Sequence, residues 1–239
     1  MKRLGVNIDH IATVRNARGE FHPDPFLAAK YVKQLGAHSI TIHLREDRRH
    51  INDLDAKLIC SIRGLKVNLE ISTNKNIVNN AIKIKPNFIC IVPEKRKEIT
   101  TEGGLNLKTN KGIISKILKR FKKKKIRTSL FVNPTIDNIK LAKLLDTDCI
   151  EIHTGRLANL VKKKYNYNHE LKKIKNCCTL AKKLNLEVHV GHGLDYKTTK
   201  ILAKIKEISE FNIGHFIIGE SIFFGLPKII KKFRKIIKN

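Results

Sequence analysis

The sequence contains no tryptophan, only four tyrosines, and no apolar run that approaches the roughly 20 residues of a membrane span. Its five cysteines stand singly or as one adjacent pair, and none shows a Cys-x-x-Cys spacing. The chain therefore offers neither a disulfide framework nor a zinc knuckle. Its amino terminus lacks the pattern of a cleavable signal and leads straight into a strand-like segment. We expect a cytoplasmic protein that does not enter a membrane.

Acidic residues are also scarce. The chain has 21 Asp and Glu against 49 Lys and Arg, which gives a formal net charge of +28. Such an excess is typical of nucleic-acid-binding proteins. Here, however, 37 lysines outnumber 12 arginines, they are spread over predicted helix faces, and few aromatic side chains are available to stack on bases. We expect attraction to polyanions without sequence preference, and no specific nucleic-acid function.

Strand-like and helix-like segments alternate along the chain. A length of 239 residues, 41% of them hydrophobic, suffices for one large core and lies in the range of one α/β barrel domain. Eight short segments have the composition of buried strands: Leu4–Asp9, Ser39–Leu44, Lys66–Ile71, Asn87–Val92, Ile126–Val132, Asp148–His153, Leu186–Val190 and Glu210–Ile213. Helical periodicity follows them, for example in Pro25–Leu35, Asn76–Ile84, Gly112–Lys122, Thr135–Leu145, Asn168–Leu184, Thr198–Lys206 and Pro227–Ile237.

This alternation predicts a (β/α)8 barrel, formed by residues 1–239 as one catalytic domain with short extra helices. A doubly wound open sheet is the alternative. Such a sheet usually carries a glycine-rich loop after its first strand. The corresponding stretch here, residues 10–19, contains one glycine and two arginines, which favours the barrel.

The stretch from Thr41 to His50 concentrates side chains suited to chemistry. A buried strand is followed within a few residues by two histidines, three arginines and two carboxylates. Proton-transfer groups beside rigid bidentate anion binders suit reactions of a phosphorylated substrate. The alternative interpretation is a solvated charged turn, with His43 satisfied in the core.

In a barrel, chemistry takes place at the carboxyl ends of the strands. Polar or titratable residues stand at nearly every predicted end: Asn7, Asp9, His10, His43, Arg45, Asn68, Glu70, Asn133, Glu151, His153, His189, His192, Asn212 and His215. Because residues two apart in a strand share a face, these include same-face pairs such as Glu151 with His153. The opposite strand ends are plainer, so we expect the chemistry at one mouth of the barrel.

Three loops at this mouth carry further signals. Val190–Gly193 and Ile213–His215 follow the last two strands and contain glycines. Barrels frequently bind phosphate with these two loops and the amino terminus of a short extra helix, which residues 216–225 could supply. The loop after the fourth strand, Pro93 to Gly104, is charged and ends in glycines, which suits a lid over the substrate.

Two reaction classes are disfavoured. A Schiff-base aldolase needs a lysine in the barrel mouth, and no upper strand end carries one. A metal hydrolase would use clustered ligands, whereas the first strand offers Asp9 and His10, adjacent residues whose side chains diverge. We therefore expect acid–base catalysis by His and Glu groups in a site with two anion sockets and no metal.

Eight motifs carry a family resemblance. They are Gly5-Val-Asn-Ile-Asp-His-Ile-Ala-Thr-Val-Arg-Asn-Ala-Arg-Gly19, His43-Leu-Arg-Glu-Asp-Arg-Arg-His-Ile51, Asn68-Leu-Glu70, Val92-Pro-Glu-Lys-Arg96, Thr100-Thr-Glu-Gly-Gly104, Glu151-Ile-His-Thr-Gly155, Gly191-His-Gly-Leu194 and Asn212-Ile-Gly-His215. With them the chain resembles, from end to end, the pyridoxine 5′-phosphate synthase family. The resemblance implies a barrel enzyme that condenses 3-amino-2-oxopropyl phosphate with 1-deoxy-D-xylulose 5-phosphate. The products would be pyridoxine 5′-phosphate, inorganic phosphate and water, and no metal or cofactor is implied.

The resemblance also implies residue roles. His43 and Glu70 would be general bases, and His192 a general acid. The amino-ketone phosphate would be held by Asn7, Gly193, Gly214 and His215. The deoxyxylulose phosphate would be held by Asp9, His10, Arg45, His50 and Thr100. Arg18 would complete a binding site, in a neighbouring subunit, and Glu151 would be a polar support whose role stays open.

Assembly is the last implication of the resemblance. The family forms dimers that assemble into octamers, and its partners are small phosphorylated molecules. His189 stands where asparagine is usual and Glu220 where arginine is common, so we expect an altered contact near the phosphate loops. The lysine-rich helix faces depart most from the family pattern, and they bear on whether the octamer forms.

Overall fold

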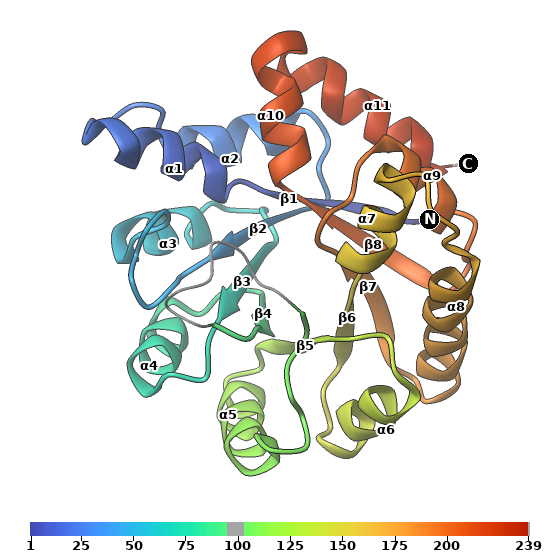
Figure 1. Cartoon of the computed structure of the whole chain (residues 1–239). Helices are drawn as coiled ribbons and strands as arrows, with labels where there is room; N and C mark the ends of the chain where they lie inside the picture. Colours follow the sequence, from blue (N-terminus) through green and yellow to red (C-terminus); the bar gives the residue numbers. More distant parts are fainter. Residues whose placement is uncertain (95–102, 239) are drawn as a thin grey trace.

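Eight parallel strands close into a barrel in the computed structural model, which describes residues 1–94 and 103–238 (Figure 1). Each strand pairs with the next, and β8 pairs with β1, so the sheet has no open edge. The strands are β1 Arg3–Asn7, β2 Ser39–His43, β3 Val67–Ile71, β4 Phe88–Ile91, β5 Arg127–Val132, β6 Cys149–His153, β7 Glu187–Gly191 and β8 Ile208–Ile213. The predicted (β/α)8 barrel is confirmed, and the doubly wound alternative is excluded.

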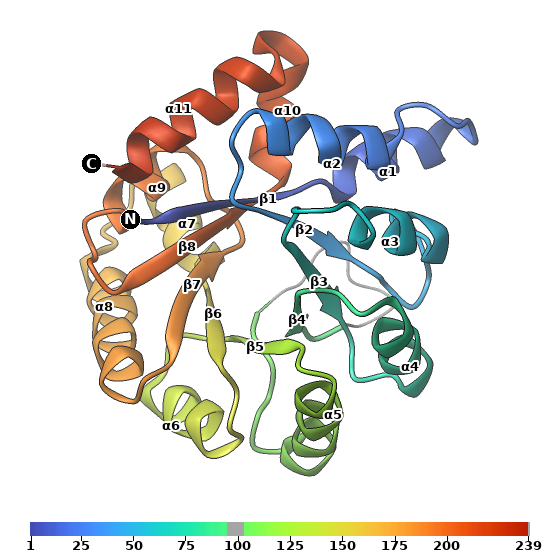
Figure 2. The same cartoon turned by 180° about the vertical axis from the view of Figure 1, so that it is seen from behind.

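Helices surround the barrel on all sides, as the two opposite views show (Figures 1 and 2). They are α1 Asp9–Arg18, α2 Pro25–Gln34, α3 Asp53–Cys60, α4 Lys75–Ile84, α5 Lys111–Lys123, α6 Ile136–Leu144, α7 Gly155–Lys162, α8 Asn168–Lys183, α9 Tyr196–Leu202, α10 His215–Phe224 and α11 Leu226–Lys238. The extra helix expected at residues 216–225 is α10, which begins directly after β8. Within the described residues, no helix is long and apolar enough to cross a membrane.

The expectation for the residues that follow the first strand was wrong. Residues 10–19 were interpreted as a loop, and Asp9 as the end of the first strand, but Asp9 begins helix α1, which ends at Gly19 in the left-handed region with a φ of 69°. The helix is mostly polar and carries no strong apolar stripe, which is the signal that periodicity depends on. Asp9 and Asn7 are neighbours nonetheless, because the helix starts immediately above the strand.

The apolar core lies between the strands and the helices. Side chains that alternate outward, such as Val6, Ile42, Leu69 and Val190, are completely buried there. Their sequence neighbours point into the barrel and are largely polar, with Thr41 and many others buried as well. The outward set supplies the hydrophobic stabilisation, so the barrel interior is left free to hold polar groups.

An ion-pair network fills the lower part of the barrel. Arg3 pairs with Glu187 and, at 2.6 Å, with Glu210, while Arg127 lies 2.9 Å from Glu187. His189 Nε2 lies 2.7 Å from the same Glu187 carboxylate. The expectation that these strand ends are plainer was therefore wrong. Because the partners come from β1, β5, β7 and β8, no local sequence pattern could reveal that they meet.

His189 belongs to this network. The altered contact expected near the phosphate loops is instead a contact with Glu187 inside the barrel. Burial alone would lower the pKa of His189, but Cys149, Glu187 and Glu210 together raise that pKa well above its usual value. The other departure, Glu220, lies on α10.

Replacing His189 by asparagine should destabilise the fold in a pH-dependent manner. A group whose folded pKa is raised stabilises fully below its unfolded pKa, near 6.5, and that stabilisation disappears as pH rises through the folded pKa. We expect the His189→Asn variant to lose about 1–3 kcal/mol of unfolding free energy at pH 6, and less at high pH. Urea denaturation at several pH values measures this, with the exposed His169→Asn as control. An equal loss at every pH would contradict the assignment.

Candidate active site

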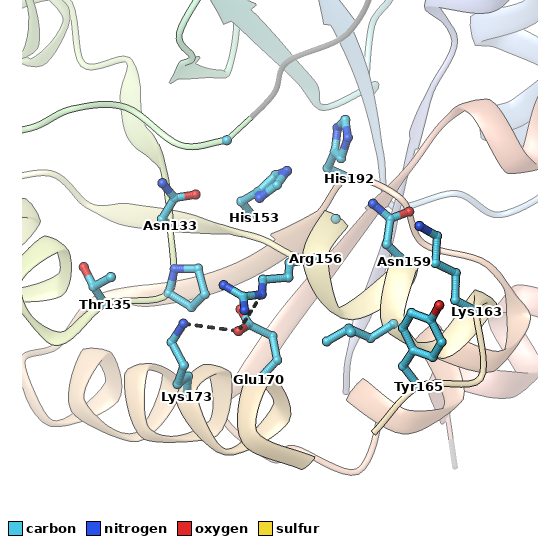
Figure 3. A pocket seen from close by; sticks show the side chains of 14 residues that line it. Asn133, Thr135, His153, Arg156, Asn159, Lys163, Tyr165, Glu170, Lys173 and His192 are labelled. Atoms are coloured by element: carbon cyan, nitrogen blue, oxygen red, sulfur yellow. Dashed lines mark hydrogen bonds and ion pairs between the residues drawn. The ribbon is translucent and has the colours of Figure 1, made fainter. Parts of the chain in front are cut away.

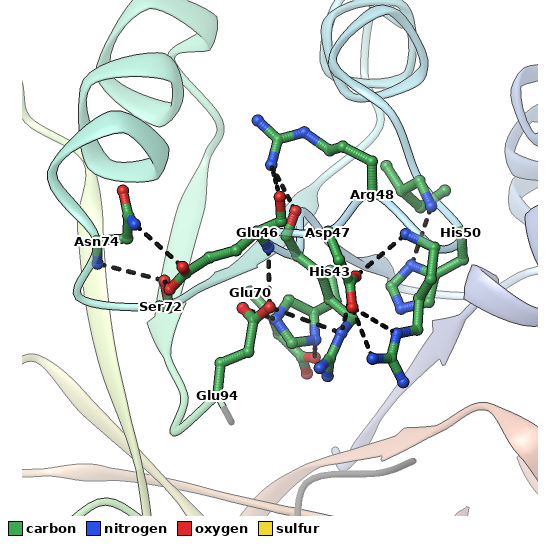
Figure 4. A network of polar contacts seen from close by, with 12 residues as sticks. His43, Glu46, Asp47, Arg48, His50, Glu70, Ser72, Asn74 and Glu94 are labelled. Atoms are coloured by element: carbon green, nitrogen blue, oxygen red, sulfur yellow. Dashed lines mark hydrogen bonds and ion pairs between the residues drawn. The ribbon is translucent and has the colours of Figure 1, made fainter. Parts of the chain in front are cut away.

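His43 lies between two carboxylates at the end of β2 (Figure 4). Its Nδ1 atom is 3.7 Å from Glu70 of β3, and its Nε2 atom is 3.5 Å from Glu94, which follows β4. The imidazole is buried, and Nε2 has no hydrogen-bond partner within the described residues. A histidine held in this way can exchange a proton with either side. The structure thus brings the predicted pair His43 and Glu70 together.

Glu94 is a site residue that the sequence interpretation missed. Its side chain is only 2% exposed, it accepts a hydrogen bond from the backbone N–H of Glu46 at 2.8 Å, and it lies 3.6 Å from Arg45 Nε. Burial alone would raise the pKa of Glu94, but His43, the Glu46 N–H and Arg45 bring that pKa below its usual value. The available signal was its place directly after the fourth strand, yet it was grouped with the predicted lid.

Two carboxyl groups, those of Glu70 and Glu151, share the barrel interior. Burial, followed by the charges of Glu151 and Asp9, raises the pKa of Glu70 well above its usual value. Burial also raises the pKa of Glu151 to about 7, although Glu151 accepts a hydrogen bond from Asn212 Nδ2 at 2.6 Å. Glu151 therefore holds a proton over part of the neutral range. A side chain at Gly191 would collide with the Glu151 carboxyl, so glycine there makes room for it.

Asp9 ties the first two strands together at the mouth. It accepts hydrogen bonds from the backbone N–H of His43 at 2.8 Å and from Asn7 Nδ2 at 2.9 Å. Its own backbone N–H donates to Asn7 Oδ1 at 2.9 Å. The carboxylate is thus fixed before any ligand arrives, and it holds His43 in place.

Arg45 lies where the first of the two anion sockets is expected. It is 3% exposed, and its Nε and Nη2 atoms have no hydrogen-bond partner within the described residues. A buried guanidinium with unused donors is costly unless a ligand satisfies it. His50 lies beside it, with its ring centroid 5.8 Å from that of His43, and burial lowers the pKa of His50. Both residues were predicted at this place.

The second socket is expected at the loops after β7 and β8. His192 and Gly193 both have left-handed backbone, with φ of 73° and 76°. Gly214 packs against Asn7 so closely that a Cβ atom would lie 2.8 Å from the Asn7 side chain. His215 begins α10, and its ring lies 4.9 Å from that of His10. Successive backbone N–H groups at a helix start suit a phosphate.

His153 and His192 form a pair of tilted rings beside this socket. Their ring centroids are 4.8 Å apart. Burial, and then the charge of His192, lowers the pKa of His153 to about 4, and burial lowers the pKa of His192. Both rings are therefore largely neutral near pH 7. A cavity of about 800 Å3 opens from these rings toward α7 and α8 (Figure 3).

One predicted site residue, Arg18, is not brought to the mouth, and a second, Thr100, lies outside the described residues. Arg18 is exposed at the far end of α1, which extends away from the barrel (Figure 1). Thr100 and the middle of the predicted lid lie outside the described residues. The two ends of that segment are fixed, however, because Glu94 contacts the β2 end and the Gly104 N–H donates to Asn133 Oδ1 at 2.9 Å.

One group of side chains could geometrically hold a metal ion within the described residues. Cys149, Glu187 and His189 each place a ligand atom within 4.8 Å of the other two. Two arginines, Arg3 and Arg127, already pair with Glu187, and their positive charges oppose a cation there. The group also lies below the mouth, away from His43. Its chemistry suits a structural ion-pair network better than catalysis.

Comparison with known proteins identifies the family. The family model described as "Pyridoxal phosphate biosynthesis protein PdxJ" matches residues 4–239. The pyridoxine 5′-phosphate synthase of Pelagibacter ubique (strain HTCC1062) is 64% identical over 236 residues, 99% of each chain. This chain belongs to the pyridoxine 5′-phosphate synthase family. The family's synthase from Zymomonas mobilis is 48% identical over 97% of this chain and 90% of that protein. The resemblance, and with it the enzyme activity that the family name states, is confirmed.

Solved structures with low sequence identity share the fold. The 3-keto-L-gulonate-6-phosphate decarboxylase of Vibrio cholerae superposes with a TM-score of 0.70 at 12% identity, covering 99% of this chain and 97% of the other. A phosphoribosylanthranilate isomerase of Thermotoga maritima gives 0.63 at 11% identity, covering 100% and 99%. At such identities these likenesses support the barrel alone.

Replacing Glu94 by glutamine should impair turnover while the fold remains. The variant keeps the shape of the side chain but removes the charge beside His43 and Arg45, so we expect kcat for pyridoxine 5′-phosphate formation to fall about 10–100-fold. Steady-state kinetics measures this, with Asp146→Asn, a distant exposed carboxylate, as control. Normal kinetics in Glu94→Gln would show that Glu94 is only a neighbour of the site.

Proposed function

We propose that the mouth of this barrel condenses 3-amino-2-oxopropyl phosphate with 1-deoxy-D-xylulose 5-phosphate to form pyridoxine 5′-phosphate, inorganic phosphate and water. The observation that carries the proposal is the buried Arg45, whose Nε and Nη2 atoms have no hydrogen-bond partner within the described residues, on one side of β1. The glycine loops after β7 and β8 lie on the other side of β1. Two sockets around one set of proton-transfer groups match two phosphorylated substrates.

The amino-ketone phosphate is assigned to the loops after β7 and β8. Gly193 and Gly214 can offer backbone N–H groups to its phosphate, and His215 stands at the start of α10, where an anion is favoured. Asn7 packs against Gly214 and can contact the same ligand. A dianion bound here also favours proton uptake by His192, which burial alone keeps neutral. His192 is then prepared to act as the general acid.

The deoxyxylulose phosphate is assigned to the β1 and β2 side. Arg45 and His50 are the phosphate ligands, and Asp9 and His10 lie within the same corner of the mouth. His10 Nδ1 is buried without a hydrogen-bond partner in the described residues, so it too can take a ligand oxygen. Thr100 and closure of the segment from Pro93 to Gly104 stay predictions, because the segment's middle lies outside the described residues.

His43 and Glu70 are the proposed bases. A carboxyl with a raised pKa is a stronger base once it is ionised. The ammonium group of the amino ketone, placed near Glu70, would favour the ionised form and so prepare it for proton abstraction. Glu151 would serve as a second proton store, since its pKa is raised to about 7. No step of this scheme requires a metal or a cofactor.

Assembly and location complete the proposal. Exposed apolar side chains, among them Phe21 and Phe223, support a homo-oligomer. By the family resemblance it would consist of dimers that assemble into an octamer. Arg18 would then reach the site of a neighbouring subunit. A cytoplasmic location is supported by five free cysteines, since thiols persist in reducing compartments. Specific nucleic-acid binding is not part of the proposal.

The direct test is product formation. Purified protein incubated with both phosphates in the presence of EDTA should develop the ultraviolet absorption of a pyridinol, and omission of either substrate should abolish it. Absence of the pyridinol with both substrates present would refute the proposed condensation. Loss of activity with EDTA and recovery with zinc would refute the metal-independent scheme.

Glu70→Gln should reduce turnover strongly and substrate affinity little. The substitution removes the basicity of the carboxyl and keeps its shape, so we expect kcat to fall roughly 10²–10⁴-fold with nearly unchanged KM values. The fold should be at least as stable, because a buried carboxyl with a raised pKa costs free energy when it ionises. A higher KM with normal kcat would make Glu70 a binding group instead.

A further inference from the structure

The cavity beside the mouth extends beyond both proposed sockets. It is bounded by the loop after β5, by α7 and by α8, and the catalytic His192 lies at its inner end (Figure 3). Neither Arg45 nor Gly214 lines it. Its volume of about 800 Å3 lies in the range of small-molecule sites. This space is larger than a catalytic histidine needs, so its outer part calls for an explanation.

Positive charge collects in that outer part. Arg156, Lys163 and Lys173 line the cavity, and the one carboxylate among its lining residues is Glu170. Glu170 is 4% exposed and lies 3.1 Å from Lys173 Nζ and 3.6 Å from Arg156 Nε. Within the described residues, no carboxylate is at ion-pair distance from Lys163. Three cations against one anion leave a net charge of +2.

The lining histidines do not add to this charge near neutral pH. Burial lowers the pKa of His153 and of His192, so both rings are largely neutral. They can instead donate or accept a hydrogen bond at the inner end. Figure 3 shows neutral donors, including Asn159 and Tyr165, around the same space. Cations and neutral donors around one space form an arrangement suited to a dianion.

Gly155 places the cavity in direct contact with the catalytic histidine. A Cβ atom there would lie 2.8 Å from both His153 Nε2 and His192 Cδ2. Helix α7 therefore begins against the two rings, and Arg156 on this helix and Lys163 directly after it stand at the cavity wall. The cavity thus reaches the loop after β7, on which His192 lies.

We propose that this cavity is a third anion site, which binds a phosphate dianion beside the amino-ketone phosphate socket. The inference rests on the proposed function, because that function supplies the phosphorylated ligands. The charge of −2 on a phosphate matches the net +2 of the lining. The dianion comes either from a phosphate monoester, the entering amino ketone or the departing pyridoxine 5′-phosphate, or from the inorganic phosphate that the condensation releases.

Calorimetric titration with inorganic phosphate tests the site in the absence of turnover. In the double variant Arg156→Gln/Lys163→Gln, Glu170 keeps its partner Lys173, so no buried carboxylate is left unpaired. We expect this variant to bind one phosphate fewer per chain than the wild type, or to bind it at least about tenfold more weakly. The matched control Lys162→Gln/Lys172→Gln removes the same charge from exposed positions outside the cavity. Its phosphate binding should stay within about twofold of the wild type.

Two outcomes would overturn the proposal. Unchanged phosphate binding in the cavity variant would show that the cavity takes no phosphate. An equal loss in both double variants would show that only the general positive charge matters. If the cavity double variant fails to fold, the single variant Lys163→Gln replaces it, with Lys162→Gln as its control.

Kinetic measurements identify the source of the dianion. If the amino ketone enters through the cavity, the cavity variant raises KM for that substrate alone. If product or released phosphate leaves through it, the variant weakens inhibition by pyridoxine 5′-phosphate or by phosphate and leaves KM unchanged. Phosphate binding at the cavity without any pyridinol formation by the wild type would refute the proposed function and not the site. Pyridinol formation without binding of a third phosphate would refute the site and not the proposed function.

Discussion

Two carboxyl groups, Glu70 and Glu151, are buried in the same barrel interior, and neither ionises easily in the presence of the other. Burial raises the pKa of both, the charges of Glu151 and Asp9 raise the pKa of Glu70 further, and the charge of Glu210 adds to the rise for Glu151. Protons are therefore held in the barrel near neutral pH, where isolated carboxyl groups would have lost them. A reaction with repeated proton transfers can use such groups in both directions. His43 lies next to Glu70 and can transfer protons between these carboxyl groups and the substrates.

The rest of the architecture makes that interior possible. Aliphatic side chains on the outward face of every strand provide the hydrophobic core, so the inward positions can be polar. Small residues clear space at the closest points: a Cβ atom at Gly191 or at Gly5 would collide with Glu151 or with Asn212. Below them, the arginine and glutamate network closes the barrel with compensated charges. The mouth is then the place where donors without a hydrogen-bond partner in the described residues, such as Nε and Nη2 of Arg45, remain for ligands.

Local patterns predicted the fold and much of the site. Alternating strand and helix segments were sufficient for the barrel, and the two-residue periodicity of strands placed His43, Glu70 and Glu151 at the mouth or inside it. Contacts between distant segments were not predictable in this way. Glu94 reaches His43 only because the segment after β4 and the end of β2 meet in space, and His189 meets Glu187, Arg3 and Glu210 from three strands. Helix α1 was missed because a polar helix lacks the apolar stripe that periodicity detects.

The central claim is that the pKa of Glu70 lies well above its usual value in the free protein. Carbon-13 NMR of protein labelled at the glutamate side-chain carboxyl carbon tests it most directly, with the Glu70→Gln variant to assign the resonance. The account predicts that the signal missing from the variant titrates well above the ordinary glutamate pKa of about 4.3. It also predicts that the Glu151 signal shifts when Glu70 is replaced. A Glu70 signal that titrates at or below the ordinary value would contradict the account.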